Sequence, residues 1–99
     1  MRGSNFDDTI TGNGNNNVFR GLGGNDTFVF KPAFGHDTIV DFHPGDVIEI
    51  NQNLFLNHDV LASAAASGAD TVITDIAGDT ITLQNVAPAN LHISDFHLV

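Results

Sequence analysis

The N-terminal half of the chain alternates polar turns with short apolar stretches at a period of nine residues. Three rows of nine follow one another without a gap and begin at Gly3, Gly12 and Gly21. After a two-residue shift, two further rows begin at Pro32 and Asp41. Each polar turn leads into a brief apolar segment, which predicts a short β-strand after every turn.

Two positions of these rows recur with the same chemistry. The sixth position holds a side chain with an oxygen ligand in every row: Asp8, Asn17, Asp26, Asp37 and Asp46. The eighth position holds a large apolar side chain in every row: Ile10, Phe19, Phe28, Ile39 and Ile48. Asp and Asn also form turns without any metal. However, a column of oxygen ligands in register with a column of core residues favours a repeated binding site.

This pattern resembles the repeats-in-toxin (RTX) family, whose repeat G-G-x-G-x-D-x-U-x binds calcium. The row that begins at Gly21 matches the repeat best. The resemblance implies an all-β fold, in which residues 3–50 form a parallel β-roll, a calcium-bound nonapeptide solenoid. It further implies that two rows complete one coil, so that turns two rows apart stack and calcium lies between them.

On that stacking, Asp8, Asp26 and Asp46 would share one edge, and Asn17 and Asp37 the other. Calcium takes about six to eight oxygen ligands, which mix carboxylates with backbone carbonyls. Glycine accepts positive φ and can direct such carbonyls into one concavity. The site at Asn17 should be weaker, because its amide carries no charge. The resemblance implies this ligand set: Asp8, Asn17, Gly21, Gly23, Gly24, Asp26, Gly35, Asp37, Asp41 and Asp46.

Residues 51–99 are expected to form a C-terminal cap of a short helix and an antiparallel hairpin. A helix is predicted over residues 58–67, with Gly68 ending it. Alternating apolar and polar positions in residues 70–75 and 79–83 predict the two strands of the hairpin.

A last strand is predicted over residues 91–99. The final residues, Asp95 to Val99, also resemble the C-terminal segment that type I secretion recognises. An alternating strand accounts for the same residues, so both interpretations stay open. The residues after Met1 are polar, and no N-terminal signal peptide is expected.

Composition narrows the range of functions. A chain of 99 residues suggests a single domain. A net charge of −9 with only three Lys or Arg residues argues against nucleic-acid binding. Bound divalent cations would cancel that charge and couple metal binding to folding. Because the chain has no cysteine, it has no disulfide bonds, and calcium is the plausible element that stabilises a small secreted domain. No apolar run approaches the roughly 20 residues of a membrane span.

The sequence gives little support for catalysis. It contains no H-E-x-x-H or G-x-S-x-G motif and no thiol. On a strand, Ser94 would face away from Asp95 and His97, so these residues do not form a hydrolytic set. The chain is therefore expected not to be an enzyme. His36, His43 and His58 lie beside predicted turns, where solvation is the simplest interpretation.

The expected function is that of a calcium-binding RTX module at the C-terminus of a larger secreted bacterial protein. Such a module would fold on calcium outside the cell and support type I secretion, while an N-terminal catalytic or toxin domain did the chemistry. The alternative is an accessory module that binds an alginate-like polysaccharide. That function needs a groove lined by cations or aromatic faces, and the chain has no Tyr or Trp. A structural adhesin segment is a third hypothesis, and calcium-dependent self-association would reveal it.

Overall fold

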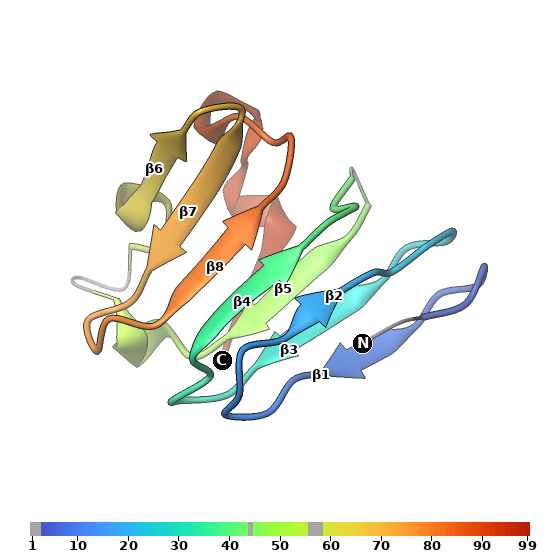
Figure 1. The fold of residues 1–99 in the computed structure, drawn as a ribbon, viewed down its shortest axis with the longest axis horizontal. Coiled ribbons are helices and arrows are strands. Elements are labelled where there is room, and N and C mark those ends of the chain that lie inside the picture. The colour runs from blue at the N-terminus through green and yellow to red at the C-terminus, as the bar shows by residue number, and fades with distance from the viewer. Residues whose placement is uncertain (1–2, 44, 56–58) are drawn as a thin grey trace.

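The computed structural model describes residues 3–43, 45–55 and 59–99. Within these residues the strands form two sheets that lie in two layers (Figure 1). One sheet has the strand order β1-β3-β5-β9, and the other has the order β2-β4-β8-β7-β6. The strand bounds are β1 Thr9–Thr11, β2 Val18–Phe19, β3 Thr27–Phe30, β4 His36–Ile39, β5 Val47–Ile50, β6 Ala64–Ser67, β7 Asp70–Thr74, β8 Thr80–Leu83 and β9 Phe96–Leu98.

The first sheet is parallel throughout. Phe28 of β3 pairs with Ile10 on one side and Ile48 on the other, and Ile48 pairs in turn with Phe96. Successive strands of the repeat alternate between the two sheets, so each strand pairs with the strand two rows away. This alternation stacks the turns of every second row.

The second sheet is mixed. β4 pairs in parallel with β2 and with β8, whereas β8 pairs with β7, and β7 with β6, in antiparallel fashion. The predicted hairpin is present as β7 and β8, with Ile73 opposite Ile81. In Figure 1, β6 and β7 lie at the opposite end of the domain from β1.

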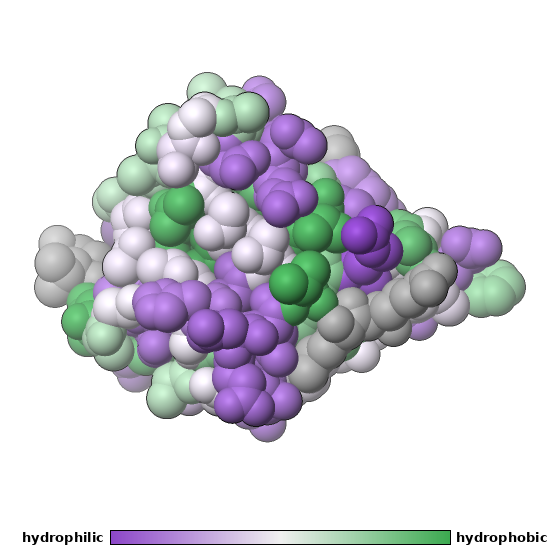
Figure 2. All heavy atoms as spheres, in the orientation of Figure 1, coloured by the Kyte–Doolittle hydropathy of each residue, from purple (hydrophilic) through white to green (hydrophobic). Residues whose placement is uncertain are grey.

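The apolar column of the repeat lies between the two sheets. All its members are buried, from Ile10 at 9% exposed to Phe19, Phe28, Ile39 and Ile48 at 0%. Phe19 meets Phe28 edge to face, with ring centroids 5.9 Å apart. The space-filling view shows hydrophilic residues across the visible face, with apolar residues in small separate groups (Figure 2). The nine-residue period therefore places its apolar column in the core.

The expected parallel β-roll with a separate cap is wrong. The residues that the structure describes form a β-sandwich-like domain and no solenoid, because the C-terminal half contributes strands to both sheets. β8 extends the sheet of β2 and β4, and its antiparallel partners make that sheet mixed. β9 extends the other sheet. Repeat strands of two to four residues thus share one core with the strands that follow them.

The predicted helix over residues 58–67 is also wrong. Residues 56–58 lie outside the described residues. The remainder forms a 3-10 turn, η3 (Leu61–Ser63), followed by β6, which pairs with β7 along its whole length. Pairing with an existing strand overrides the helix propensity of alanine. The described residues contain no α-helix.

The predicted last strand is shorter than expected. Leu91 and His92 are extended but belong to no strand, Ile93–Asp95 form a 3-10 turn, and only β9 pairs as a strand. The described 3-10 turns outside η3 are η1 (Gln52–Leu54), η4 (Pro88–Asn90) and η5 (Ile93–Asp95).

Candidate metal centre

The turns before β1, β3 and β5 stack along one edge of the parallel sheet. The amide of Asp8 donates to Oδ1 of Asp26 at 3.0 Å. The amide of Asp26 donates to Oδ1 of Asp46 at 2.8 Å. Each carboxylate thus uses one oxygen to bind the backbone of the turn below it. This edge, formed by Asp8, Asp26 and Asp46, is called the first acidic edge below.

The second oxygen of Asp26 has no partner. Asp26 is 1% exposed, and its Oδ2 is buried without a hydrogen bond. A side chain at Gly21 would collide with this oxygen, so the glycine leaves space beside it. An ionised oxygen that is buried and unpaired is costly, unless a proton or a cation compensates it.

Asp46 and His43 complete a cluster around Asp26. One ligand atom from each of these three residues lies within 4.8 Å of the other two. The amide of His43 donates to Oδ2 of Asp46 at 3.1 Å. Nε2 of the His43 ring lies 3.5 Å from the same oxygen. Asp46 is 1% exposed. Two buried carboxylates and an imidazole therefore converge on one region.

The second acidic edge, formed by Asn17 and Asp37, repeats the arrangement. The amide of Asn17 donates to Oδ1 of Asp37 at 2.6 Å. Oδ2 of Asp37 is buried without a partner, and the residue is 1% exposed. Oδ1 of Asn17 accepts the amide of Asn13 at 3.1 Å. This edge has one buried carboxylate, Asp37, whereas the first acidic edge has two, Asp26 and Asp46. The free oxygen on this edge is Oδ2 of Asp37.

Burial raises the pKa of Asp26, Asp37 and Asp46 above the ordinary carboxyl value. In each residue a backbone hydrogen bond opposes this shift. Charge from Asp8 and Asp41 raises the pKa of Asp26 further. The ionised form of each carboxyl is therefore disfavoured in the folded protein without a cation, and a divalent cation would reverse that preference.

The predicted glycines serve the stacking of the turns. Gly24 and Gly35 adopt φ of +79° and +82°, which other residues rarely accept. A Cβ at Gly24 would lie 2.6 Å from the backbone carbon of Phe6, two rows below. A Cβ at Gly23 would have its nearest contact at 3.2 Å from the carbonyl oxygen of Asn5. Gly21 acts differently, since it makes room at Asp26.

The structure separates Asp41 from the paired carboxylates. Its two oxygens accept the amides of Gly21 and Leu22 at 2.9 and 2.8 Å. Asp41 therefore stabilises the turn that contains Gly21, and its negative charge raises the pKa of Asp26. Asp8 lies at the outer end of the edge, partly exposed, where it accepts the amide of Ser4 at 2.5 Å.

Sequence reasoning missed three polar residues that connect stacked turns. Oδ1 of Asp7 accepts the amide of Asn25 at 2.7 Å, and Oδ1 of Asn16 accepts the amide of His36 at 3.0 Å. His43, expected to be merely solvated, joins the Asp26 cluster. Its spacing of three residues before Asp46, across a turn, was the signal available in the sequence.

The donor set fits a hard divalent cation. Calcium coordination uses short carboxylates, and the free buried oxygen of Asp26 is available to it. The residues that would hold calcium on this edge are Asp26 and Asp46, with Asp8 at its end. Calcium there would supply the positive charge that the buried carboxylates lack.

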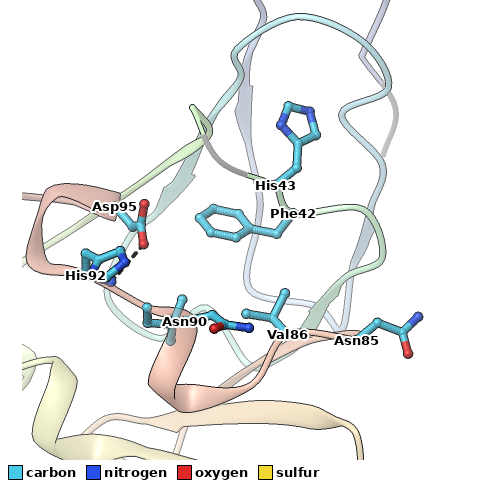
Figure 3. Close-up of a pocket in the computed structure, with 8 residues that line it drawn as sticks. Phe42, His43, Asn85, Val86, Asn90, His92 and Asp95 are labelled. Atoms are coloured by element: carbon cyan, nitrogen blue, oxygen red, sulfur yellow. Dashed lines mark hydrogen bonds between the residues drawn. The ribbon is translucent and has the colours of Figure 1, made fainter.

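An open groove adjoins the Asp26 cluster through His43, which lines it (Figure 3). Its volume is about 470 Å³. Figure 3 shows the ring of Phe42 directed toward the side of the groove that carries His92 and Asp95. Oδ2 of Asp95 accepts the amide of His92 at 2.9 Å. The other lining residues are Asn85, Val86, Asn90 and Leu91.

The fold has a counterpart among solved structures. The chain is similar to part of the extracellular lipase LipA from Serratia marcescens, with a TM-score of 0.73 and 18% sequence identity. The match covers 98% of this chain and 20% of the lipase chain, so this chain spans about a fifth of that protein. Neither a protein-family model nor a curated protein matches the sequence. Among the described residues, no helix has the length and apolar character needed to cross a membrane.

Proposed function

We propose that the chain is a calcium-binding module of the RTX type. The observation that carries the proposal is Asp26, a buried carboxylate with one unpaired oxygen and with the carboxylate of Asp46 nearby. The same arrangement recurs at Asp37, so the nine-residue period places a buried carboxylate with an unpaired oxygen on both edges. This recurrence supports the proposal.

Calcium binding by this module is coupled to folding. The carboxylates of the first acidic edge come together only when the turns stack, and the chain carries a net charge of −9. Extracellular calcium modules have affinities of about 10⁻⁴ to 10⁻³ M, so each site adds on the order of 1 kcal/mol at millimolar calcium and almost nothing at cytosolic levels. The chain would therefore remain incompletely folded at the calcium level inside the cell and would fold outside it.

The module would serve a larger bacterial protein that leaves the cell by type I secretion. The likeness to a fifth of an extracellular lipase chain supports this setting. Chemistry would reside in a catalytic or toxin domain N-terminal to the module. The module itself would not be an enzyme, and its role would be calcium-triggered folding after export.

The direct test is far-UV circular dichroism and thermal melting of the metal-depleted chain, with calcium added stepwise. We expect calcium to increase β structure and to raise the melting temperature by about 4–8 °C for each kcal/mol gained. Magnesium at the same concentration is the control for ionic strength and should act weakly, because it gives up its water ligands reluctantly. Unchanged spectra and melting temperature at millimolar calcium would sink the proposal.

The groove beside Phe42 favours one second candidate, a carbohydrate-binding accessory function. An aromatic face next to the amide side chains of Asn85 and Asn90 offers stacking and hydrogen bonds to a sugar ring. Titration of an alginate-like polysaccharide into the calcium-loaded chain tests it. We expect Phe42→Ala to abolish any binding if the groove is the site. Unchanged binding in that variant would exclude the groove.

A further inference from the structure

The turn between β7 and β8 contains a second arrangement of carboxylates outside the nine-residue repeat. Oδ1 of Asp75 accepts the amides of Ala77 and Asp79, each at 2.9 Å. The amide of Asp75 donates to the carbonyl oxygen of Asp79 at 3.0 Å. Gly78 adopts φ of +89°, which closes the turn. The backbone therefore holds the two aspartates in a fixed relation.

The remaining oxygens of this pair have no partner. Oδ2 of Asp75 and Oδ2 of Asp79 are both buried without a hydrogen bond, and Asp75 is 5% exposed. Burial raises the pKa of Asp75, and the charge and side chain of neighbouring Asp79 raise it further. Two carboxylates in contact cannot both ionise in a buried site without a compensating charge. The turn thus needs either a shared proton or a cation.

The pair lies next to the second acidic edge. The amide of Thr80 donates to the carbonyl oxygen of Gly35 at 3.0 Å, and the side chains of His36 and Thr80 approach to 2.8 Å. The charge of Asp79 raises the pKa of Asp37, whose own Oδ2 has no partner. Asp79 therefore lies close enough to the second acidic edge to act on Asp37 by its charge, although the pairing of β4 with β8 places Ile81, not an oxygen ligand, beside Asp37.

An open cavity lies on the Asp75 side of the turn. Its volume is about 240 Å³, and it is lined by Asp75 together with Thr74, Asp59 and Ser63, among other residues, but not by Asp79. Calcium commonly completes its six to eight ligands with water and backbone carbonyls. Two protein carboxylates can then suffice as the charged part of a site.

We propose that Asp75 and Asp79 form a further divalent-cation site in the β7–β8 turn, selective for hard cations such as calcium. The ion would bridge the two unpaired oxygens and fasten the hairpin to the second acidic edge. This site goes beyond the repeat and is independent of Asp26. Its effect is to make the C-terminal hairpin, as well as the repeat, responsive to calcium.

The test uses backbone amide resonances of the whole metal-depleted chain during calcium titration to about 10 mM. We expect the amides of Ala77 and Gly78 to shift and saturate. Asp79→Asn should weaken this local binding by about tenfold or more, because one charged ligand is lost. Asp70→Asn is the matched control. It makes the same charge change on the same hairpin, where Oδ1 of Asp70 accepts the amide of Asn85 at 2.8 Å.

Thermal melting gives a second measurement. Without metal, Asp79→Asn should melt above the unsubstituted chain, because the new amide removes one charge and can donate to Asp75. With saturating calcium the order should reverse, and Asp70→Asn should show no such reversal. A site on the hairpin also predicts that Ala77 and Gly78 still respond to calcium in Asp26→Asn.

The outcomes separate this site from the function proposed for the repeat. If calcium shifts the amides of the first acidic edge but leaves Ala77 and Gly78 unmoved, the hairpin site is overturned and the repeat sites stand. If Ala77 and Gly78 respond to pH alone, the pair shares a proton and the proposal is equally overturned. If no amide responds to calcium, both proposals fail.

Discussion

In residues 3–50 each strand follows a polar turn and pairs with the strand two rows away, whereas residues 51–99 reach the same two sheets through irregular turns. The first half gains its order from stacked turns, in which carboxylates accept amides of neighbouring rows. The second half gains it from antiparallel pairing, which joins β6, β7 and β8.

The difference assigns separate roles to the two halves. Stacked turns bring like charges together, so the repeat half concentrates negative charge that a cation would compensate. Parallel stacking also leaves open sheet edges, which invite further pairing. β8 and β9 cover the edges of β4 and β5, and the non-repeating half thereby ends the stack. The repeat half thus holds the stacked carboxylates, and the non-repeating half ends the stack, within one shared core.

Removal of the second half tests this division most severely. A fragment that ends at Gln52 loses β8 and β9, one neighbour each of β4 and β5, and exposes Ile39, Ile48 and Ile50, all 0% exposed in the domain. The loss is comparable with the whole stability of a small domain, about 5 kcal/mol or more. We expect no monomeric β structure even in calcium, by circular dichroism with light scattering. A soluble monomer with the full calcium-induced spectrum would show that the repeat half folds alone.

Two isoleucines of the apolar column measure how the halves depend on each other. Ile48 lies between Phe28 and Phe96 and is 0% exposed, whereas Ile10 has Phe28 on one side only and is 9% exposed. We expect Ile48→Ala to lower the free energy of unfolding by about 4 kcal/mol and Ile10→Ala by about 2 kcal/mol. Urea denaturation in calcium measures both. Equal losses of unfolding free energy in the two variants would mean that the pairing of β5 with β9 adds no stability.

The repeat half was the more predictable from sequence. The period of nine correctly placed Ile10, Phe19, Phe28, Ile39 and Ile48 in the core, because a strict repeat must give each row the same surroundings. The stacking of Asp8, Asp26 and Asp46 followed from the resemblance to the RTX repeat, which implies that turns two rows apart stack. Their metal binding stays a prediction.

The second half was less predictable, because its structure depends on distant partners. Ala64–Ser67 have no strand pattern of their own and become β6 only by pairing with β7. β9 pairs with β5 at a separation that no local pattern encodes. The meeting of Asp75 and Asp79 required the turn geometry, although both residues were visible beside the predicted hairpin.

Within the repeat half, Asp26 should matter more to calcium binding than Asp8. Asp26 is linked by hydrogen bonds to Asp8 below and Asp46 above, and it has the unpaired oxygen. Asp26→Ala should lower both the stoichiometry and the affinity measured by calorimetry, while Asp8→Ala should weaken only the end of the edge. Asp70→Ala makes the same charge change outside both acidic edges and serves as the control. Equal calcium binding by the Asp26 and Asp8 variants would refute the proposed pairing of rows.

The pH dependence of stability should change sign with calcium. Burial raises the pKa of Asp26, Asp37 and Asp46, so without metal the folded state binds more protons than the unfolded state above about pH 4. Their stabilising contribution is present below that pH and is lost as pH rises through the folded-state pKa values. Bound calcium favours the ionised carboxylates, so stability should instead be lost as pH falls.

Melting curves of the metal-depleted chain between about pH 4 and 7, with and without saturating calcium, measure the two slopes. Each pKa unit corresponds to about 1.4 kcal/mol, which is several degrees of melting temperature for a domain of this size. Asp26→Asn should flatten the metal-free slope, and Asp75→Asn should do the same for the C-terminal half, because burial also raises the pKa of Asp75. If calcium leaves the direction of the slope unchanged, the buried carboxylates do not bind the ion. If only Asp75→Asn flattens the slope, the charge-sensitive half of the domain is the hairpin and not the repeat.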